Sequence, residues 1–220
     1  MNPGKREEIF RRLRSANPEP KSELTYRTPY ELLVAVVLSA QATDKSVNLA
    51  SAKLFPLAAT PQAMLALGQA RLTGLIRRIG LFRTKAKNVL ALSALLLERH
   101  GGEVPAQREA LQALPGVGRK TASVVLNVAF GQPTIAVDTH VFRVANRTGL
   151  APGRDPAAVE AKLLKFTPAQ FRQHAHHWLI LHGRHVCLAR RPRCPHCGIR
   201  DLCEFRPKTR AYNAPSVKDS

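Results

Sequence analysis

The fold of this chain is decided by residues 111–129, which read LQALPGVGRKTASVVLNVA. The pattern predicts a short apolar helix that ends at Leu114 and a second helix that begins near Arg119. The turn between them, Pro115-Gly116-Val117-Gly118, contains two glycines, which permit positive φ and let another backbone approach closely. Its main-chain N–H groups point outward at a helix N-terminus, an arrangement that binds phosphate without reading bases. The alternative interpretation is an ordinary helical hairpin whose glycine turn binds no phosphate.

The net charge helps to distinguish a phosphate-binding hairpin from an ordinary one. The 220 residues include 34 Lys and Arg against 15 Asp and Glu, a formal charge of +19. Such an excess favours a polyanionic partner, because these cations displace counterions from phosphates. A ribosomal or basic housekeeping protein would carry similar charge, so charge alone does not decide. Charge and hairpin together favour nucleic acid, with contacts predicted at Gly116, Val117, Gly118 and Arg119.

Helix signals are dense along the rest of the chain. Thr28-Pro29-Tyr30-Glu31 forms a capping box with proline at the first helical position, and it predicts a helix through Ser39. Within it, Leu32–Leu38 is apolar on all sides, which predicts a buried central helix. Further caps are predicted at Thr60-Pro61, Asp155-Pro156 and Thr167-Pro168, and helix ends at Gly68, Gly101 and Gly149. No strand-like alternation is found, so we expect an all-α chain of roughly ten helices.

Neither a membrane span nor a secretion signal is expected from this sequence. It begins with polar, charged residues, and its longest apolar runs, Leu32–Leu38 and Val89–Leu97, fall far short of the ~20 residues that span a bilayer. We therefore expect a soluble, cytoplasmic protein with no membrane partner. The polar residues 212–220 are expected to form a disordered tail.

All four cysteines of the chain fall in one stretch with the spacing C-x6-C-x2-C-x5-C: Cys187, Cys194, Cys197 and Cys203. Two disulfides, a four-thiolate zinc site and a 4Fe-4S cluster are the candidates. An intracellular compartment argues against disulfides, and only one short C-x-x-C knuckle is present, but spacing does not exclude zinc. A metal would hold the first ligand loop rigid, where three cations could meet a DNA backbone: Arg190, Arg191 and Arg193.

Two further residues are candidates for chemistry. Lys120 lies in the first turn of the hairpin's second helix, where the helix dipole disfavours a cation and favours a neutral, nucleophilic amine. From this stretch alone, a lysine that only binds phosphate is the favoured interpretation. Asp138 follows an apolar run and precedes a helical pattern, which indicates an N-cap that is compatible with a catalytic carboxylate.

Four motifs in this order carry a family resemblance: VLSAQATD at 37–44, LPGVGRKTA at 114–122, TIAVDTH at 134–140, and the cysteine tail. Together they closely resemble the endonuclease III family of the helix-hairpin-helix DNA glycosylase superfamily, over nearly the whole chain to about Glu204. The resemblance implies a six-helix domain, residues 22–132, that contains the hairpin 111–130. A second domain, residues 1–21 and 133–211, is expected to hold a 4Fe-4S cluster on the four cysteines, with DNA in the cleft between the domains.

The resemblance also assigns roles. Lys120 becomes the expected nucleophile and Asp138 its catalytic partner, while Gln41 is expected to fill the hole left by an extruded base. Leu81 should wedge the opposite strand, and His140 should also contact DNA. The implied enzyme is a monomeric, nucleoid-associated DNA glycosylase and AP lyase that acts on duplex DNA with oxidised pyrimidines or abasic sites.

Two alternatives remain beside this interpretation. Adenine-excising relatives lack the hairpin lysine and usually carry an extra C-terminal domain, so Lys120 and the short chain argue against them. A non-catalytic DNA-binding protein explains the charge and the hairpin, but gives no reason for Lys120 together with Asp138. One departure from the family pattern is Gln112, where relatives often have Glu; it leaves the basic mechanism intact but bears on how the pocket tunes Lys120.

Overall fold

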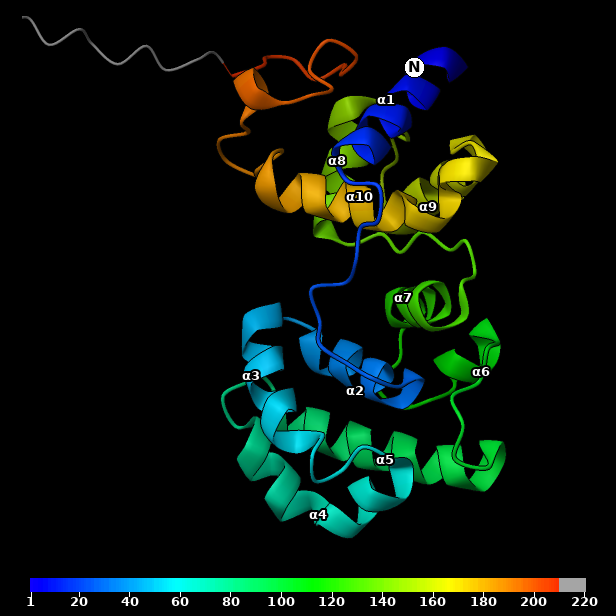
Figure 1. Ribbon diagram of the computed structural model, residues 1–220, viewed down its shortest axis with the longest axis vertical. Helices are drawn as coiled ribbons and strands as arrows, with labels where there is room; N and C mark the ends of the chain where they lie inside the picture. Colours follow the sequence, from blue (N-terminus) through cyan, green and yellow to red (C-terminus); the bar gives the residue numbers. More distant parts are fainter. Residues whose placement is uncertain (210–220) are drawn as a thin grey trace, which may run out of the picture. The chain divides into compact units, whose positions relative to one another are not determined.

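The computed structural model describes residues 1–209, and over this range the chain is all-helical (Figure 1). No strand occurs among these residues, which confirms the predicted fold class and the expected number of helices. The helices are α1 Pro3–Ala16, α2 Pro29–Ser39, α3 Asp44–Leu54, α4 Pro61–Ile76, α5 Phe82–His100, α6 Arg108–Gln112, α7 Arg119–Phe130, α8 Thr139–Thr148, α9 Pro156–Phe166 and α10 Arg172–His185, with short 3-10 helices η1 Ala169–Phe171 and η2 Cys194–His196. The tail predicted at 212–220 lies outside the described residues.

The chain divides into two compact units. One is continuous, Lys21–Ala136, and contains helices α2 to α7. The other joins Met1–Pro20 to the described residues from Val137 onward, and contains α1 and α8 to α10. Among the helices of residues 1–209, none combines the length with the apolar character that a bilayer-spanning segment needs.

Helix α2 forms the centre of the continuous unit, as its uniformly apolar sequence predicts. Thr28 caps it by accepting a hydrogen bond from the Glu31 N–H at 3.1 Å, and the Glu31 carboxylate accepts from the Arg27 N–H at 2.6 Å. Every residue from Tyr30 to Leu38 is buried. Helices α3, α5 and α7 pack against it, so burial of α2 organises the unit that carries the hairpin.

The predicted helix boundaries are confirmed at most positions. Thr60 and Asp155 cap α4 and α9, and Gly68, with φ of 76°, interrupts α4 with a kink. The predicted cap at Thr167 is wrong. The Thr167 N–H instead donates to the Leu163 carbonyl and ends α9, and η1 intervenes before α10 begins.

The second unit has an aromatic core that ties the N-terminal helix to the C-terminal half. The ring centroids of Phe10 and Phe171 lie 5.8 Å apart, and Trp178 packs against both. The Trp178 indole N–H donates to the Asn17 carbonyl at 2.7 Å. Distant parts of the sequence therefore share one core, which supports the cysteine-bearing loop that follows α10.

Candidate nucleic-acid interface and thiol pocket

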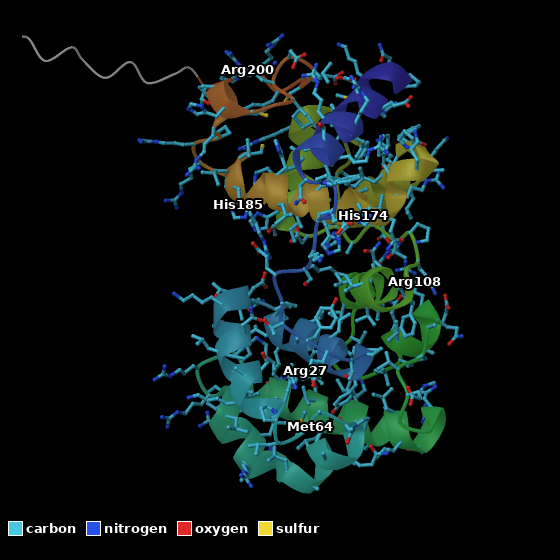
Figure 2. All side chains as sticks on the ribbon, in the orientation of Figure 1. Arg27, Met64, Arg108, His174, His185 and Arg200 are labelled. Carbon is cyan, nitrogen blue, oxygen red and sulfur yellow. The ribbon has the colours of Figure 1, made fainter. Side chains whose placement is uncertain are left out.

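The hairpin forms as the sequence predicts, with small differences at its ends. Helix α6 ends at Gln112, slightly before the predicted Leu114, and α7 begins at Arg119. Between them the Val117 N–H donates to the Leu114 carbonyl at 3.1 Å and closes a tight turn. Arg108 of α6, labelled in Figure 2, donates to the Ser123 hydroxyl of α7 at 2.8 Å, which ties the two helices together.

The two glycines of the turn serve different purposes. Gly116 has φ of +79°, and a Cβ there would lie 3.0 Å from Asn88 Nδ2 and 3.3 Å from Val37 Cγ1. Gly118 has φ of −89°, which any residue adopts, and a Cβ there would meet nothing within 4 Å. The fold therefore requires glycine at 116, whereas glycine at 118 keeps the outer side of the turn open.

The predicted contact residues of the hairpin are mostly exposed. Gly116, Gly118, Arg119 and Lys120 are exposed, and Gly118 provides no side-chain cap for the first turn of α7. The Val117 side chain is buried, and its N–H is already used within the turn, so Val117 shapes the turn rather than extending from it. The arrangement presents a positively charged helix N-terminus of the kind that binds anions.

Gln41 and Leu81 are the only non-glycine residues in the described chain with positive φ, at 53° and 58°. Both are exposed, Leu81 by 61% of its surface. Residue patterns alone indicate a helix end at Gln41 and a core residue at Leu81, and the second of these is wrong. A Cβ on Gly80 would lie 3.6 Å from the Gln41 carbonyl oxygen, so the two turns are neighbours.

Asp138 caps α8, which confirms the N-cap interpretation. Its Oδ1 accepts from the His140 N–H at 2.9 Å and from the Val141 N–H at 2.8 Å, so a single oxygen serves both bonds. His140 is half-buried, and its Nδ1 lies 3.2 Å from Arg143 Nη2. Lys120 belongs to the continuous unit and Asp138 to the other, and the catalytic role of each remains a prediction.

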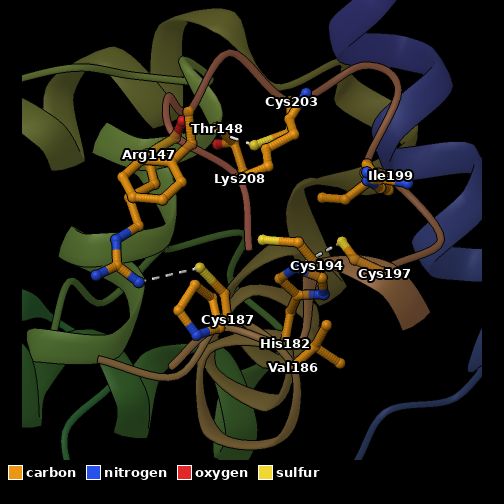
Figure 3. Close-up of a pocket in the computed structure, with 13 residues that line it drawn as sticks. Arg147, Thr148, His182, Val186, Cys187, Cys194, Cys197, Ile199, Cys203 and Lys208 are labelled. Atoms are coloured by element: carbon orange, nitrogen blue, oxygen red, sulfur yellow. Dashed lines mark hydrogen bonds between the residues drawn. The ribbon is translucent and has the colours of Figure 1, made fainter. Parts of the chain in front are cut away.

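The four cysteines line one pocket after α10 (Figure 3). Their half-buried sulfurs face a common space, and all four are free thiols, so the disulfide alternative is wrong. The pocket encloses about 370 Å³ not filled by atoms, part of it open to solvent, beside Thr148, Ile199 and Phe205.

The spacing of these thiols bears on which metal they would hold. Within residues 1–209, no three His, Cys, Asp or Glu side chains are grouped closely enough to hold one metal ion. With Zn–S of about 2.3 Å, a four-thiolate zinc site would bring its sulfurs to within roughly 4 Å of one another. The donor set is thiolate-only, which suits a four-thiolate zinc site and a cubane cluster alike.

Burial raises the pKa of the Cys197 and Cys203 thiols above the usual range. Without a metal, these two thiols are therefore protonated at neutral pH. Metal binding would release their protons, because the thiolate is the ligand form.

Two arginines of α8 hold the cysteine loop, and residue patterns did not single them out. Arg143 Nε donates to the Cys187 carbonyl at 2.9 Å, and Arg147 donates to the carbonyls of Leu188 and Ala189 at 2.7 Å each. Arg147 Nη1 also lies 3.7 Å from Cys187 Sγ. Their spacing of four residues places both arginines on one face of α8, and this spacing was the sequence signal that could have identified them as a pair.

The three loop arginines are exposed: Arg190, Arg191 and Arg193. The Arg193 N–H donates to the Val186 carbonyl at 2.8 Å and so closes the loop at its base. Hydrogen bonds from α8 and from its own base therefore hold the loop in place, while its cationic side chains remain exposed to solvent.

An all-helical fold with this hairpin and thiol pocket is that of a DNA repair glycosylase. Residues 34–169 match the HhH-GPD superfamily of base excision DNA repair proteins, and the chain belongs to this family. It is 61% identical to endonuclease III of Haemophilus influenzae and of Escherichia coli over 208 residues, which cover 94% of this chain and 99% of each relative. The chain is accordingly an enzyme of the DNA glycosylase and AP lyase class, and it acts in base excision repair.

Solved structures agree with this family. A non-covalent endonuclease III–DNA complex is 43% identical with a TM-score of 0.87, covering 93% of this chain and 96% of that chain. A thermostable thymine-DNA glycosylase is 25% identical with a TM-score of 0.82, covering 92% of this chain and 96% of its own.

Proposed function

We propose that this enzyme removes oxidised pyrimidines from duplex DNA and then cleaves the strand 3′ to the abasic site through a lysine Schiff base. The observation that carries the proposal is the placement of Lys120, exposed in the first turn of α7 beside a turn suited to phosphate. A trapped covalent endonuclease III–DNA intermediate, 43% identical to this chain, supports a protein nucleophile. Similarity to a thymine-DNA glycosylase supports a pyrimidine substrate.

The chemistry begins after the damaged base leaves the stack. The neutral Lys120 amine attacks the sugar C1′, and the base departs with the electron pair of the glycosidic bond. Asp138 accepts a proton from the attacking amine or stabilises positive charge on the sugar. Ring opening yields a Schiff base, loss of a C2′ proton follows, and the 3′ phosphate leaves in β-elimination.

The remaining surface features support DNA binding around this centre. The first-turn amides of α7 would hold phosphate, and the absence of a side chain at Gly118 leaves room for that approach. The exposed turns at Gln41 and Leu81 would fill the space left by the base and wedge the opposite strand. We expect the enzyme to work as a monomer at the nucleoid in the cytoplasm.

Cys187, Cys194, Cys197 and Cys203 would hold a 4Fe-4S cluster. The thiolate-only donor set and the pocket that it lines support this assignment. The cluster would organise the loop that carries the exposed arginines and supply no step of the reaction. About four irons per freshly purified chain are expected, as a cubane requires. One zinc and no iron would overturn the assignment.

The decisive experiment is borohydride trapping on duplexes with an abasic site or an oxidised pyrimidine. Lys120→Gln should abolish the cross-link and strand cleavage while largely keeping affinity, because Gln retains the length and the hairpin amides remain. Arg119→Gln is the matched control, since it removes a neighbouring exposed cation without removing the amine. It should weaken binding yet still cross-link at saturating DNA. A cross-link retained in Lys120→Gln, or no cross-link in the wild type, would refute the proposal.

A further inference from the structure

Lys85 is a buried cation that the proposed chemistry does not use. It lies in the first turn of α5 and is only 5% exposed. Its ammonium donates to the Leu38 carbonyl at 2.9 Å and to the Ala40 carbonyl at 2.6 Å. Burying a lysine is unfavourable unless its donors are satisfied, so this site is built for a cation.

The two acceptors lie at the end of α2, where carbonyl groups lack partners within the helix. The negative end of the α2 dipole also favours a cation at this position. Burial lowers the pKa of Lys85, but two carbonyl acceptors favour the charged form. The lysine therefore acts as a C-terminal cap for α2 that is supplied by another helix.

The capped end of α2 leads directly into the turn of Gln41. Ala40 has φ of −56° and ψ of 117°, Gln41 has φ of 53°, and the Ala42 N–H donates to the Ser39 carbonyl at 3.0 Å. This is a type II turn whose third position normally takes glycine or asparagine. A glutamine held there is strained, and such strain persists only where surrounding contacts enforce it.

The other end of the Lys85 linkage is the turn of Leu81. The Lys85 N–H donates to the Leu81 carbonyl at 3.0 Å, and Leu81 begins α5 in the left-handed region with no side-chain cap. Any residue at position 85 would make this backbone bond, because it is the first hydrogen bond of α5. What the lysine adds is its side chain, which ties the start of α5, just after the turn of Leu81, to the carbonyls that precede Gln41.

We propose that Lys85 is a positioning residue for damaged DNA, which holds the turns of Gln41 and Leu81 in adjacent, pre-formed conformations. The inference rests on the proposed function, in which these two side chains enter the duplex. Because Lys85 is buried, it acts through those side chains and not by contact with phosphate. Its loss should therefore reduce discrimination for damaged duplexes and leave the electrostatic part of binding unchanged.

The test compares Lys85→Met with Lys87→Met, which removes an exposed lysine from the same helix. Affinities are measured for an undamaged duplex and for one with a stable abasic analogue, over a range of salt concentrations. Lys85→Met should lower the preference for the abasic duplex roughly ten- to hundredfold, the scale of coupling between residues of one hydrogen-bond network. The slope of log affinity against log salt concentration should stay unchanged, because Lys85 makes no phosphate contact. Lys87→Met should keep the preference.

A second readout separates positioning from general destabilisation. 2-Aminopurine placed opposite the abasic analogue brightens when it is unstacked, and Lys85→Met should reduce that signal at saturating protein. Lys85→Gln, which keeps an N–H donor group but loses the charge, should give an intermediate signal. In a protein that already carries Gln41→Ala and Leu81→Ala, adding Lys85→Met should lower the preference for the abasic duplex only slightly further. The reason is that substitutions acting through the same contacts are not additive.

The outcomes separate this inference from the proposed function. If Leu81→Ala alone leaves the preference for abasic DNA unchanged, the wedge role fails and the inference fails with it. If Leu81→Ala lowers the preference but Lys85→Met does not, the positioning role of Lys85 is overturned and the wedge role stands. Failure of both Lys85 variants to fold, judged by circular dichroism, would assign Lys85 to the fold itself and also overturn the inference.

Discussion

Replacing each hairpin glycine by alanine gives opposite expected results, although the two lie only one residue apart. Gly116→Ala should strongly destabilise the protein, because alanine would be forced to a φ of +79° against Asn88 and Val37. Gly118→Ala should leave stability unchanged or slightly raised, since its φ of −89° suits alanine and a Cβ meets nothing within 4 Å.

The magnitudes follow from these two environments. A left-handed conformation costs alanine about 1–2 kcal/mol, and overpacking costs about 1–3 kcal/mol more, so Gly116→Ala should lose about 2–5 kcal/mol of unfolding free energy. At Gly118, restricting the unfolded chain should add about 0.4–1 kcal/mol, and the poorer preference of alanine for the N-cap position of α7 offsets most of this gain. The same methyl group would project to where a phosphate is expected, so duplex affinity should fall in Gly118→Ala.

Urea unfolding followed by circular dichroism measures the first effect, and fluorescence anisotropy with a labelled duplex measures the second. Comparison of the two variants cancels the general effect of adding a methyl group to the turn. A loss below about 0.5 kcal/mol in Gly116→Ala, the usual range for harmless surface changes, would refute the steric argument. Wild-type affinity in a folded Gly118→Ala protein would refute the open phosphate site.

Three further predictions concern Asp138, the cysteine loop and His177, a buried residue of α10. Asp138→Asn should keep the α8 cap, because one oxygen accepts both bonds, yet slow single-turnover base removal by on the order of 10²–10⁴; wild-type rates would show that Asp138 is only a cap. Arg191→Ala should lower the salt slope of duplex binding by roughly one unit, and an unchanged slope would place Arg191 away from phosphate. Burial, with repulsion from His174, lowers the pKa of His177 from 6.5 to about 4, so its contribution to stability is complete above pH 6.5 and is lost as pH falls towards 4. His177→Gln should therefore remove about 2 kcal/mol of the stability lost between pH 7 and pH 5 in urea unfolding, and parallel pH profiles for the two proteins would contradict this.

Local sequence determined the features that depend on local physics. The caps at Thr28, Thr60 and Asp155 and the hairpin turn are encoded by adjacent residues, because capping and turn conformations depend on a few neighbours. The buried α2 was equally predictable, since a helix that is apolar on all sides has no face suited to water. The cap predicted at Thr167 failed because the same residue types also follow a helix end.

Tertiary structure decided which residues meet across the sequence. Three such contacts link residues more than 25 positions apart. They are the hydrogen bonds of Lys85 to the end of α2, the close contact of position 116 with Asn88, and the hydrogen bonds of Arg147 to the cysteine loop. Residue type gave no sign that Lys85 is buried or that Leu81 is exposed, because lysine is usually at the surface and leucine usually in the core. Such reversals depend on which helix packs where, and helical periodicity identifies the face that is buried but not the partner that covers it.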